Sequence, residues 1–196
     1  ENVGPLIYNL IQIIRPTNVL EVGLGYSTAL IAEGLFKSKT NFEKERKSLF
    51  NFYSHKKYIN KEEMSYIKNL NPEYHFKLGK ALSKLRKENM LIIGSGFTFH
   101  NMQALMSQNS GVDFKNEEFE QWLIDTCTNP NYSPSLQEQK LIEWSEAPFA
   151  SYCQPREEHL LPLHVCAGVS GSTAKLVFEG KVAGKKTSAF LWNDFT

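Results

Sequence analysis

The chain has 196 residues, of which 41% are hydrophobic, so it is long enough for one domain with a packed core but not for two complete catalytic domains. Its 22 basic and 21 acidic residues leave a net charge of +1, and no overall field favours nucleic acid or an anionic membrane as a partner. Cys127, Cys153 and Cys166 form no CxxC pair, which indicates a reducing, cytoplasmic location and no disulfide framework.

The first 36 residues predict a strand between two short helices. Residues 5–14 and 28–36 have helical character, and residues 18–23, Asn-Val-Leu-Glu-Val-Gly, predict a buried strand closed by glycine. The sequence begins at Glu1 with neither an initiator Met nor a leader pattern, and no apolar run approaches membrane-spanning length. We therefore expect a soluble chain, and a fragment, a gene fusion and a misjoined reading frame stay open as explanations of its organisation.

Residues 37–69 differ in composition from the rest of the chain. Residues 37–68 hold nine Lys or Arg against four Glu, with aromatic residues interleaved and no clear period before Glu62. Such a stretch could contact RNA, but a solvated, loosely ordered face is the more common outcome where no known RNA-binding module is present. We interpret this segment as a basic linker or insertion.

From Pro72 the pattern becomes regular and predicts an α/β domain, a layered sheet with flanking helices. An apolar strand at residues 90–93 opens into the glycine turn at 94–96, and an alternating pair of strands flanks a turn at 183–184. The predicted elements in this half are helices near 76–85, 116–128 and 135–144, and strands at 90–93, 175–182 and 186–192.

His100 follows the predicted strand and glycine turn, at the end of the sheet where α/β proteins usually bind ligands. Gly94 and Gly96 would let the backbone approach a ligand with no Cβ in the way. A histidine there can exchange a proton with a phenol near neutral pH. On local pattern alone, a histidine that caps the following helix is an equal alternative.

His159 precedes a predicted helix that carries Pro162 in its first turn. The positive end of a helix dipole disfavours the imidazolium, so the lone pair of His159 would stay available to a metal ion. His164 lies five residues further on, on a different face of the helix. We interpret His164 as a core or supporting residue.

Taken together, short motifs in residues 70–196 resemble, in order, landmarks of the class III extradiol ring-cleavage dioxygenases, the LigB-like family, in its 4,5-DOPA extradiol dioxygenase branch. The motifs are residues 78–82 (Leu-Gly-Lys-Ala-Leu), 91–96 (Leu-Ile-Ile-Gly-Ser-Gly), His100-Asn101, Phe119 with Trp122-Leu123, Ala147-Pro148, 155–163 and 188–190. The resemblance implies a truncated LigB-like fold with an extra N-terminal βα unit.

What the resemblance implies chemically is a non-haem Fe(II) enzyme, sometimes isolated with zinc, that opens a catechol such as DOPA with O2. By matching positions, His159 is a metal ligand, and His100 is the acid/base close to the metal, near enough to be counted as a ligand as well. The family's remaining ligands come from its N-terminal half, where His55 is the one histidine upstream of the matching region. A second copy of the chain or a partner subunit would otherwise complete the site.

A second resemblance covers the N-terminal unit, residues 1–36. Residues 19–28, which include Glu21, Gly23 and Gly25, resemble motif I of S-adenosylmethionine-dependent O-methyltransferases. Glu21 would be the acid at the strand end, and the two glycines would let the loop approach the cofactor. Three hypotheses follow: an extradiol dioxygenase or its remnant, a methyltransferase-like fragment with S-adenosylmethionine affinity, and a non-catalytic binding protein on the dioxygenase scaffold.

Overall fold

A computed structural model describes residues 18–22, 70–87, 90–107 and 111–193, and every structural statement below concerns these residues. The predicted helices at 5–14 and 28–36 and the linker at 37–69 lie outside them. Within them the chain mixes helices with two small sheets, which confirms the predicted α/β class.

The first sheet pairs two strands that are distant in the sequence. β1 (Asn18–Val22) lies parallel to β2 (Met90–Gly94), with Val22 opposite Gly94. Both strands were predicted. Because parallel strands end at the same edge, the end of β1 lies beside the glycine turn that leads to His100.

The second sheet is the predicted hairpin. β3 (Lys175–Val182) and β4 (Lys185–Leu191) pair antiparallel across Ala183 and Gly184, whose φ values are 51° and 79°. Positive φ at both central residues is the geometry of a type I′ turn, which suits the twist of a hairpin. β4 begins one residue earlier than predicted, because the turn needs only two residues.

Helices flank both sheets, and the side chains at their starts explain where they begin. Asn71, Asp113 and Ser133 cap α5 (Pro72–Leu82), α7 (Phe114–Thr128) and α8 (Pro134–Ile142). α7 starts two residues earlier than predicted because Asp113 is its cap. The remaining helical elements are the 3-10 turns η1 (Ser83–Lys87), η2 (Trp144–Glu146) and η3 (Glu157–His159), and the helices α6 (Met102–Met106), α9 (Ala150–Cys153) and α10 (Leu161–Ser170).

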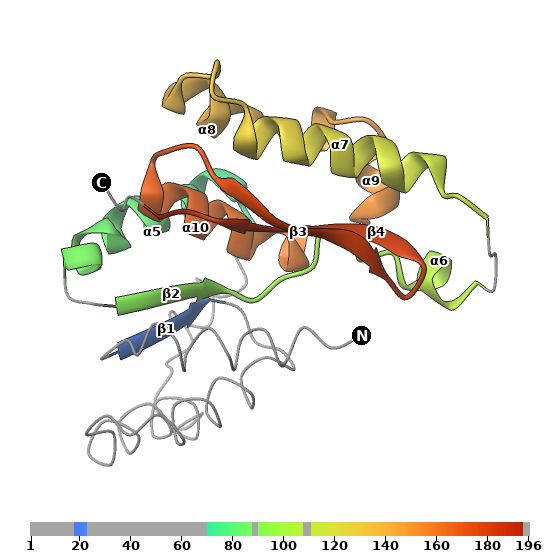
Figure 1. The fold of residues 1–196 in the computed structure, drawn as a ribbon, viewed down its shortest axis with the longest axis horizontal. Coiled ribbons are helices and arrows are strands. Elements are labelled where there is room, and N and C mark those ends of the chain that lie inside the picture. The colour runs from blue at the N-terminus through green and yellow to red at the C-terminus, as the bar shows by residue number, and fades with distance from the viewer. Residues whose placement is uncertain (1–17, 23–69, 88–89, 108–110, 194–196) are drawn as a thin grey trace, which may run out of the picture.

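The elements form layers. In Figure 1, α7 and α8 lie along one side of the molecule and the β1–β2 pair along the other, with α5, α10 and the hairpin between them. α5 and α10 pack with their backbones in contact: a Cβ added to Gly79 would lie 2.9 Å from the Cα of Gly168. Because these two glycines have no side chain, α10 can lie close against α5. α10 also contacts β2.

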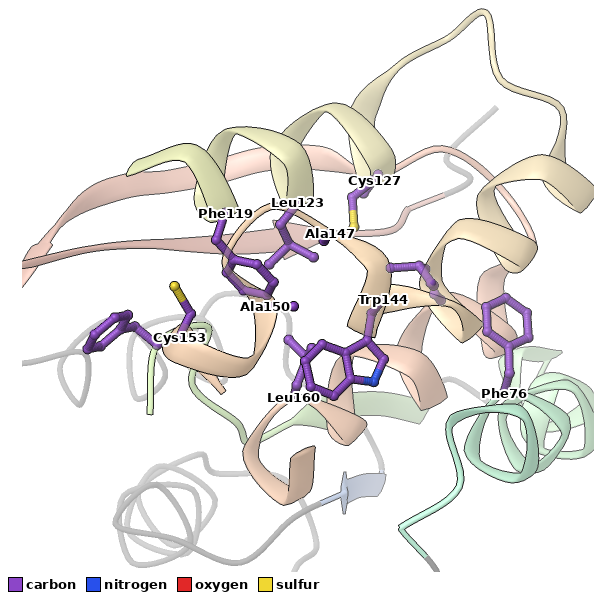
Figure 2. Close-up of a cluster of buried hydrophobic side chains, with 13 residues drawn as sticks. Phe76, Phe119, Leu123, Cys127, Trp144, Ala147, Ala150, Cys153 and Leu160 are labelled. Carbon is purple, nitrogen blue, oxygen red and sulfur yellow. The ribbon is translucent and has the colours of Figure 1, made fainter. Parts of the chain in front are cut away.

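An apolar cluster joins α5, α7, α8 and α10. Phe119, Leu123 and Cys127 project from α7 toward Trp144 and Leu160, as Figure 2 shows, and Phe76 reaches the cluster from α5. Phe99, just before His100, is fully buried in the same cluster. The core therefore extends to the loop that carries the first candidate histidine. No helix in the described part of the chain combines the length and apolar character needed to cross a membrane.

Candidate functional site

The structure brings His100 and His159 together, although 58 residues separate them in the sequence. Their rings are stacked, with centroids 3.5 Å apart and planes inclined by 29°. Both side chains are partly exposed, so solvent or a ligand can reach the pair. The two residues predicted independently from the sequence thus lie side by side in one candidate site.

The glycine turn after β2 makes this approach feasible. A Cβ added to Gly96 would lie less than 3.0 Å from the carbonyl oxygen of His159, closer than real Cβ atoms come. The amide of Phe97 donates to that same oxygen at 2.9 Å. We expected Gly94 and Gly96 to admit a ligand, but what they admit in the structure is the backbone of the segment around His159 and Pro162.

Hydrogen bonds also hold the chain at His100 and Asn101. The amide of His100 donates to the Cys153 carbonyl at 2.9 Å, and Nδ2 of Asn101 donates to the Tyr152 carbonyl at 2.8 Å. Oδ1 of Asn101 accepts from the Ala104 amide and so caps α6. The capping explanation for His100 is therefore wrong, since Asn101 fills that role, and the His100 ring is left for other contacts.

His159 lies in η3, immediately before α10, as its sequence context predicted. Burial is the main cause that lowers the pKa of this imidazole, and the neighbouring His100 lowers it further, while Glu158 acts in the opposite direction. A lowered pKa keeps the ring neutral and its lone pair available. The helix dipole alone predicts the same neutral state.

One carboxylate lies beside the pair. Oε1 of Glu158 is 3.9 Å from Nε2 of His159, while Oε2 of the same side chain pairs with Arg156 at 2.6 Å. Two imidazoles and a carboxylate are the kinds of donor that non-haem iron prefers. The described residues nevertheless contain no group of three His, Cys, Asp or Glu side chains placed to hold one ion. They fit part of such a donor set.

The other predicted site residues take no part in this pair. His55, Gly23 and Gly25 lie outside the described residues. Glu21 is partly buried on β1, opposite Ile93 of β2.

His164 is a core residue, as predicted. It is fully buried, its Nε2 lies 2.7 Å from the Leu141 carbonyl oxygen, and its Nδ1 lies 3.2 Å from that of Leu160. Burial lowers the pKa of His164 to about 4, so the ring is neutral at physiological pH.

One acidic residue close to the histidine pair was not predicted. Glu120, on α7, is fully buried beneath the loop that carries His100, and its Oε2 accepts from the Ser188 hydroxyl at 2.8 Å. Helical spacing held a signal for this burial, because Asn116, Glu120, Leu123 and Cys127 follow one another at intervals of four, three and four residues along one helical face.

Comparison with known proteins agrees with the resemblance. Residues 53–189 match the family model described as the catalytic LigB subunit of aromatic ring-opening dioxygenase. This match includes part of the segment predicted as a linker, and the predicted domain boundaries at 36/37 and 69/70 stay predictions.

Individual relatives point the same way. The chain is 34% identical over 114 residues to a 4,5-DOPA dioxygenase extradiol of Beta vulgaris, covering 58% of this chain and 40% of that protein. It is 37% identical over 102 residues to one of Mirabilis jalapa, covering 52% and 36% respectively. The chain thus matches 40% or less of the length of these relatives.

One solved structure shares the fold. The crystal structure of the uncharacterized protein JW3007 from Escherichia coli K12 superimposes with a TM-score of 0.51 at 21% identity, covering 60% of this chain and 48% of that one. At this level of identity the likeness concerns the fold alone.

Proposed function

The chain belongs to the LigB family of aromatic ring-opening dioxygenases, and from this premise we propose that it serves in the extradiol cleavage of a catechol by O2. The observation that supports the proposal is the stacked pair of His100 and His159. A substrate of the DOPA type is proposed because relatives are named for that substrate.

In this proposal His159 is a metal ligand. Its lowered pKa leaves the imidazole neutral, as a ligand must be, and its ring stacks on that of His100. The metal proposed is Fe(II), which when bound would hold the diol and O2 together and let electrons pass between them. The remaining donors would come from outside the described residues, with His55 as one candidate, or from a partner chain or second copy.

His100 is proposed as the acid/base. Its ring lies against that of His159, where a catechol bound next to the metal would present its hydroxyl groups. His100 would take a proton from one hydroxyl as the diol binds and return a proton later in the reaction. The hydrogen bonds of the His100 amide and of the Asn101 side chain would hold the backbone that carries the ring in place for both transfers.

The proposal is tested by adding Fe(II) anaerobically, then DOPA and O2, and following the yellow ring-opened product. We expect His159→Gln to retain iron at least ~10-fold more weakly, and His100→Gln to keep iron but lose turnover by roughly 10²–10⁴. His75→Gln is the matched control, because His75 lies within α5 with its Nδ1 2.9 Å from the Asn71 carbonyl oxygen. If the unaltered chain takes up no iron and forms no product, the hypothesis that remains is a binding protein on the family scaffold.

A further inference from the structure

Glu120 is a charged residue in an apolar place. Its side chain is fully buried on α7, close to Cys127 and Cys153 of the core cluster. Burying a carboxyl group costs free energy unless hydrogen bonds offset the loss of water. Oε2 accepts from Ser188, whereas Oε1 has no hydrogen-bond partner within the described ranges. With only one of its oxygens hydrogen-bonded, a buried carboxyl does not stabilise the fold. Stability therefore does not explain why Glu120 lies here.

The partners of Glu120 lead to the candidate site. Ser188 belongs to β4, and its amide donates to the hydroxyl oxygen of Thr98 at 3.3 Å. The Thr98 hydroxyl also lies close enough to the Glu120 carboxyl to lower its pKa. Three elements thus meet in one buried polar cluster: α7 through Glu120, β4 through Ser188, and the loop before His100 through Thr98.

This loop is fixed residue by residue. Phe97 donates its amide to His159, and its carbonyl accepts from Nε2 of Gln154 at 2.8 Å. Thr98 and Phe99 are buried, and the amide of His100 donates to Cys153. The contacts of Phe97 and His100 hold the loop toward η3 and α9. Thr98 holds it toward β4, and through Ser188 toward Glu120 of α7.

We propose that Glu120 is a positioning residue: through Thr98 and Ser188 it fixes, from inside the core, the loop that places His100 against His159. This inference rests on the function proposed for His100. It assigns Glu120 no contact with substrate or metal.

The electrostatic surroundings agree with this role. Burial raises the pKa of Glu120 to about 7, while the Thr98 and Ser188 hydroxyls and Lys186 lower it and Glu179 raises it. The thiols of Cys127 and Cys153 also face the carboxyl, and burial raises their own pKa values, so they stay neutral. Near neutral pH the hydrogen bonds of Glu120, more than a fixed charge, therefore hold the cluster together.

The test is native-state hydrogen exchange of the full chain, read at the amides of Phe97 and His100. These amides report the loop directly, because they donate to His159 and Cys153. Exchange is compared with each variant's own global unfolding, so that a general loss of stability cancels. A residue that only stabilises the core would change all slow amides together.

Four variants separate the alternatives. Glu120→Leu and Thr98→Val remove the buried cluster, and we expect the two loop amides to exchange about tenfold faster, the equivalent of one net hydrogen bond. Glu120→Gln keeps an oxygen that can accept from Ser188 and should exchange within about threefold of the unaltered chain. Thr126→Val is the control, because Thr126 is equally buried on α7 and its hydroxyl has no hydrogen-bond partner in the described part of the chain.

The proposal would be overturned if the exchange rates of the loop amides were unchanged in Glu120→Leu and Thr98→Val, or rose equally in Thr126→Val. It would also be overturned if these amides exchanged as fast in Glu120→Gln as in Glu120→Leu. Because exchange needs neither metal nor substrate, absence of ring cleavage would count against the proposed function and not against this inference. Where the iron-loaded chain is active, Glu120→Leu should lower kcat more than it raises KM. Equal kcat values would contradict the positioning role.

Discussion

Replacing Gly96 with Ala is the sharpest test of how the two histidines are brought together. The new Cβ would start less than 3.0 Å from the His159 carbonyl oxygen, and ordinary contact begins at 3.4 Å. The oxygen is a backbone atom and the Cβ is fixed to the backbone of residue 96, so neither can rotate away. The two segments would have to move apart, and the 2.9 Å hydrogen bond from the Phe97 amide to the His159 carbonyl would lengthen beyond the usual limit of about 3.2 Å.

The expected loss of stability follows from these two effects. Overpacking costs roughly 1–3 kcal/mol, and the lost hydrogen bond adds about 1 kcal/mol. We therefore expect Gly96→Ala to lower the free energy of unfolding by roughly 2–4 kcal/mol, measured by guanidinium denaturation with tryptophan fluorescence. Gly111→Ala is the control, because a Cβ there meets nothing within 4 Å, and its effect should stay within about 0.5 kcal/mol. If the two variants unfold at the same denaturant concentration, the explanation given for Gly96 is wrong.

Three further predictions concern stability. Gly168→Ala puts a Cβ 3.2 Å from the Cα of Gly79 and closer still to the Phe76 carbonyl oxygen. Calorimetry should therefore show a lower Tm, equivalent to a loss of roughly 1–3 kcal/mol of stability. A Tm equal to that of Gly111→Ala would refute the backbone contact. The pKa of Glu120 rises from 4.5 to about 7 on folding. Its contribution to the free energy of unfolding is therefore present below pH 4.5 and lost as pH rises through 7. Across that range denaturation curves should show Glu120→Gln gaining roughly 3 kcal/mol of stability relative to the unaltered chain. A constant difference would exclude this linkage. The pKa of His164 falls from 6.5 to about 4, so its contribution is lost as pH falls from 6.5 through 4; His164→Gln should flatten this acid limb of the stability profile, and an unchanged limb would assign it to other groups.

Much of the fold was predictable because its signals are local. The strand at 90–93, the turn at 183–184 and the helix that carries Pro162 near its start each depend on a few adjacent residues. The end of α8 was less predictable: the apolar pattern runs on to Trp144, but the helix stops at Ile142 and Trp144 enters a 3-10 turn. Tertiary packing of the indole in the core decides that boundary.

The candidate site was predictable in its members but not in its construction. His100 and His159 stand out by residue type and position, yet their stacking depends on a close backbone approach at Gly96 that no local pattern encodes. Glu120 was missed for the opposite reason. A glutamate between Phe119 and Gln121 is ordinarily a solvated residue, and only the partners Thr98 and Ser188, distant in the sequence, make its burial tolerable.

The loop from Ser95 to Asn101 has a consequence for heat inactivation. Its residues are hydrogen-bonded to η3, to α9 and the residue after it, and to β4. Local opening of this loop would break contacts with several elements at once. Its opening free energy therefore approaches the unfolding free energy of the whole domain. Warming should therefore leave the imidazole pair intact until the domain melts, and the pair should then be lost in one cooperative step.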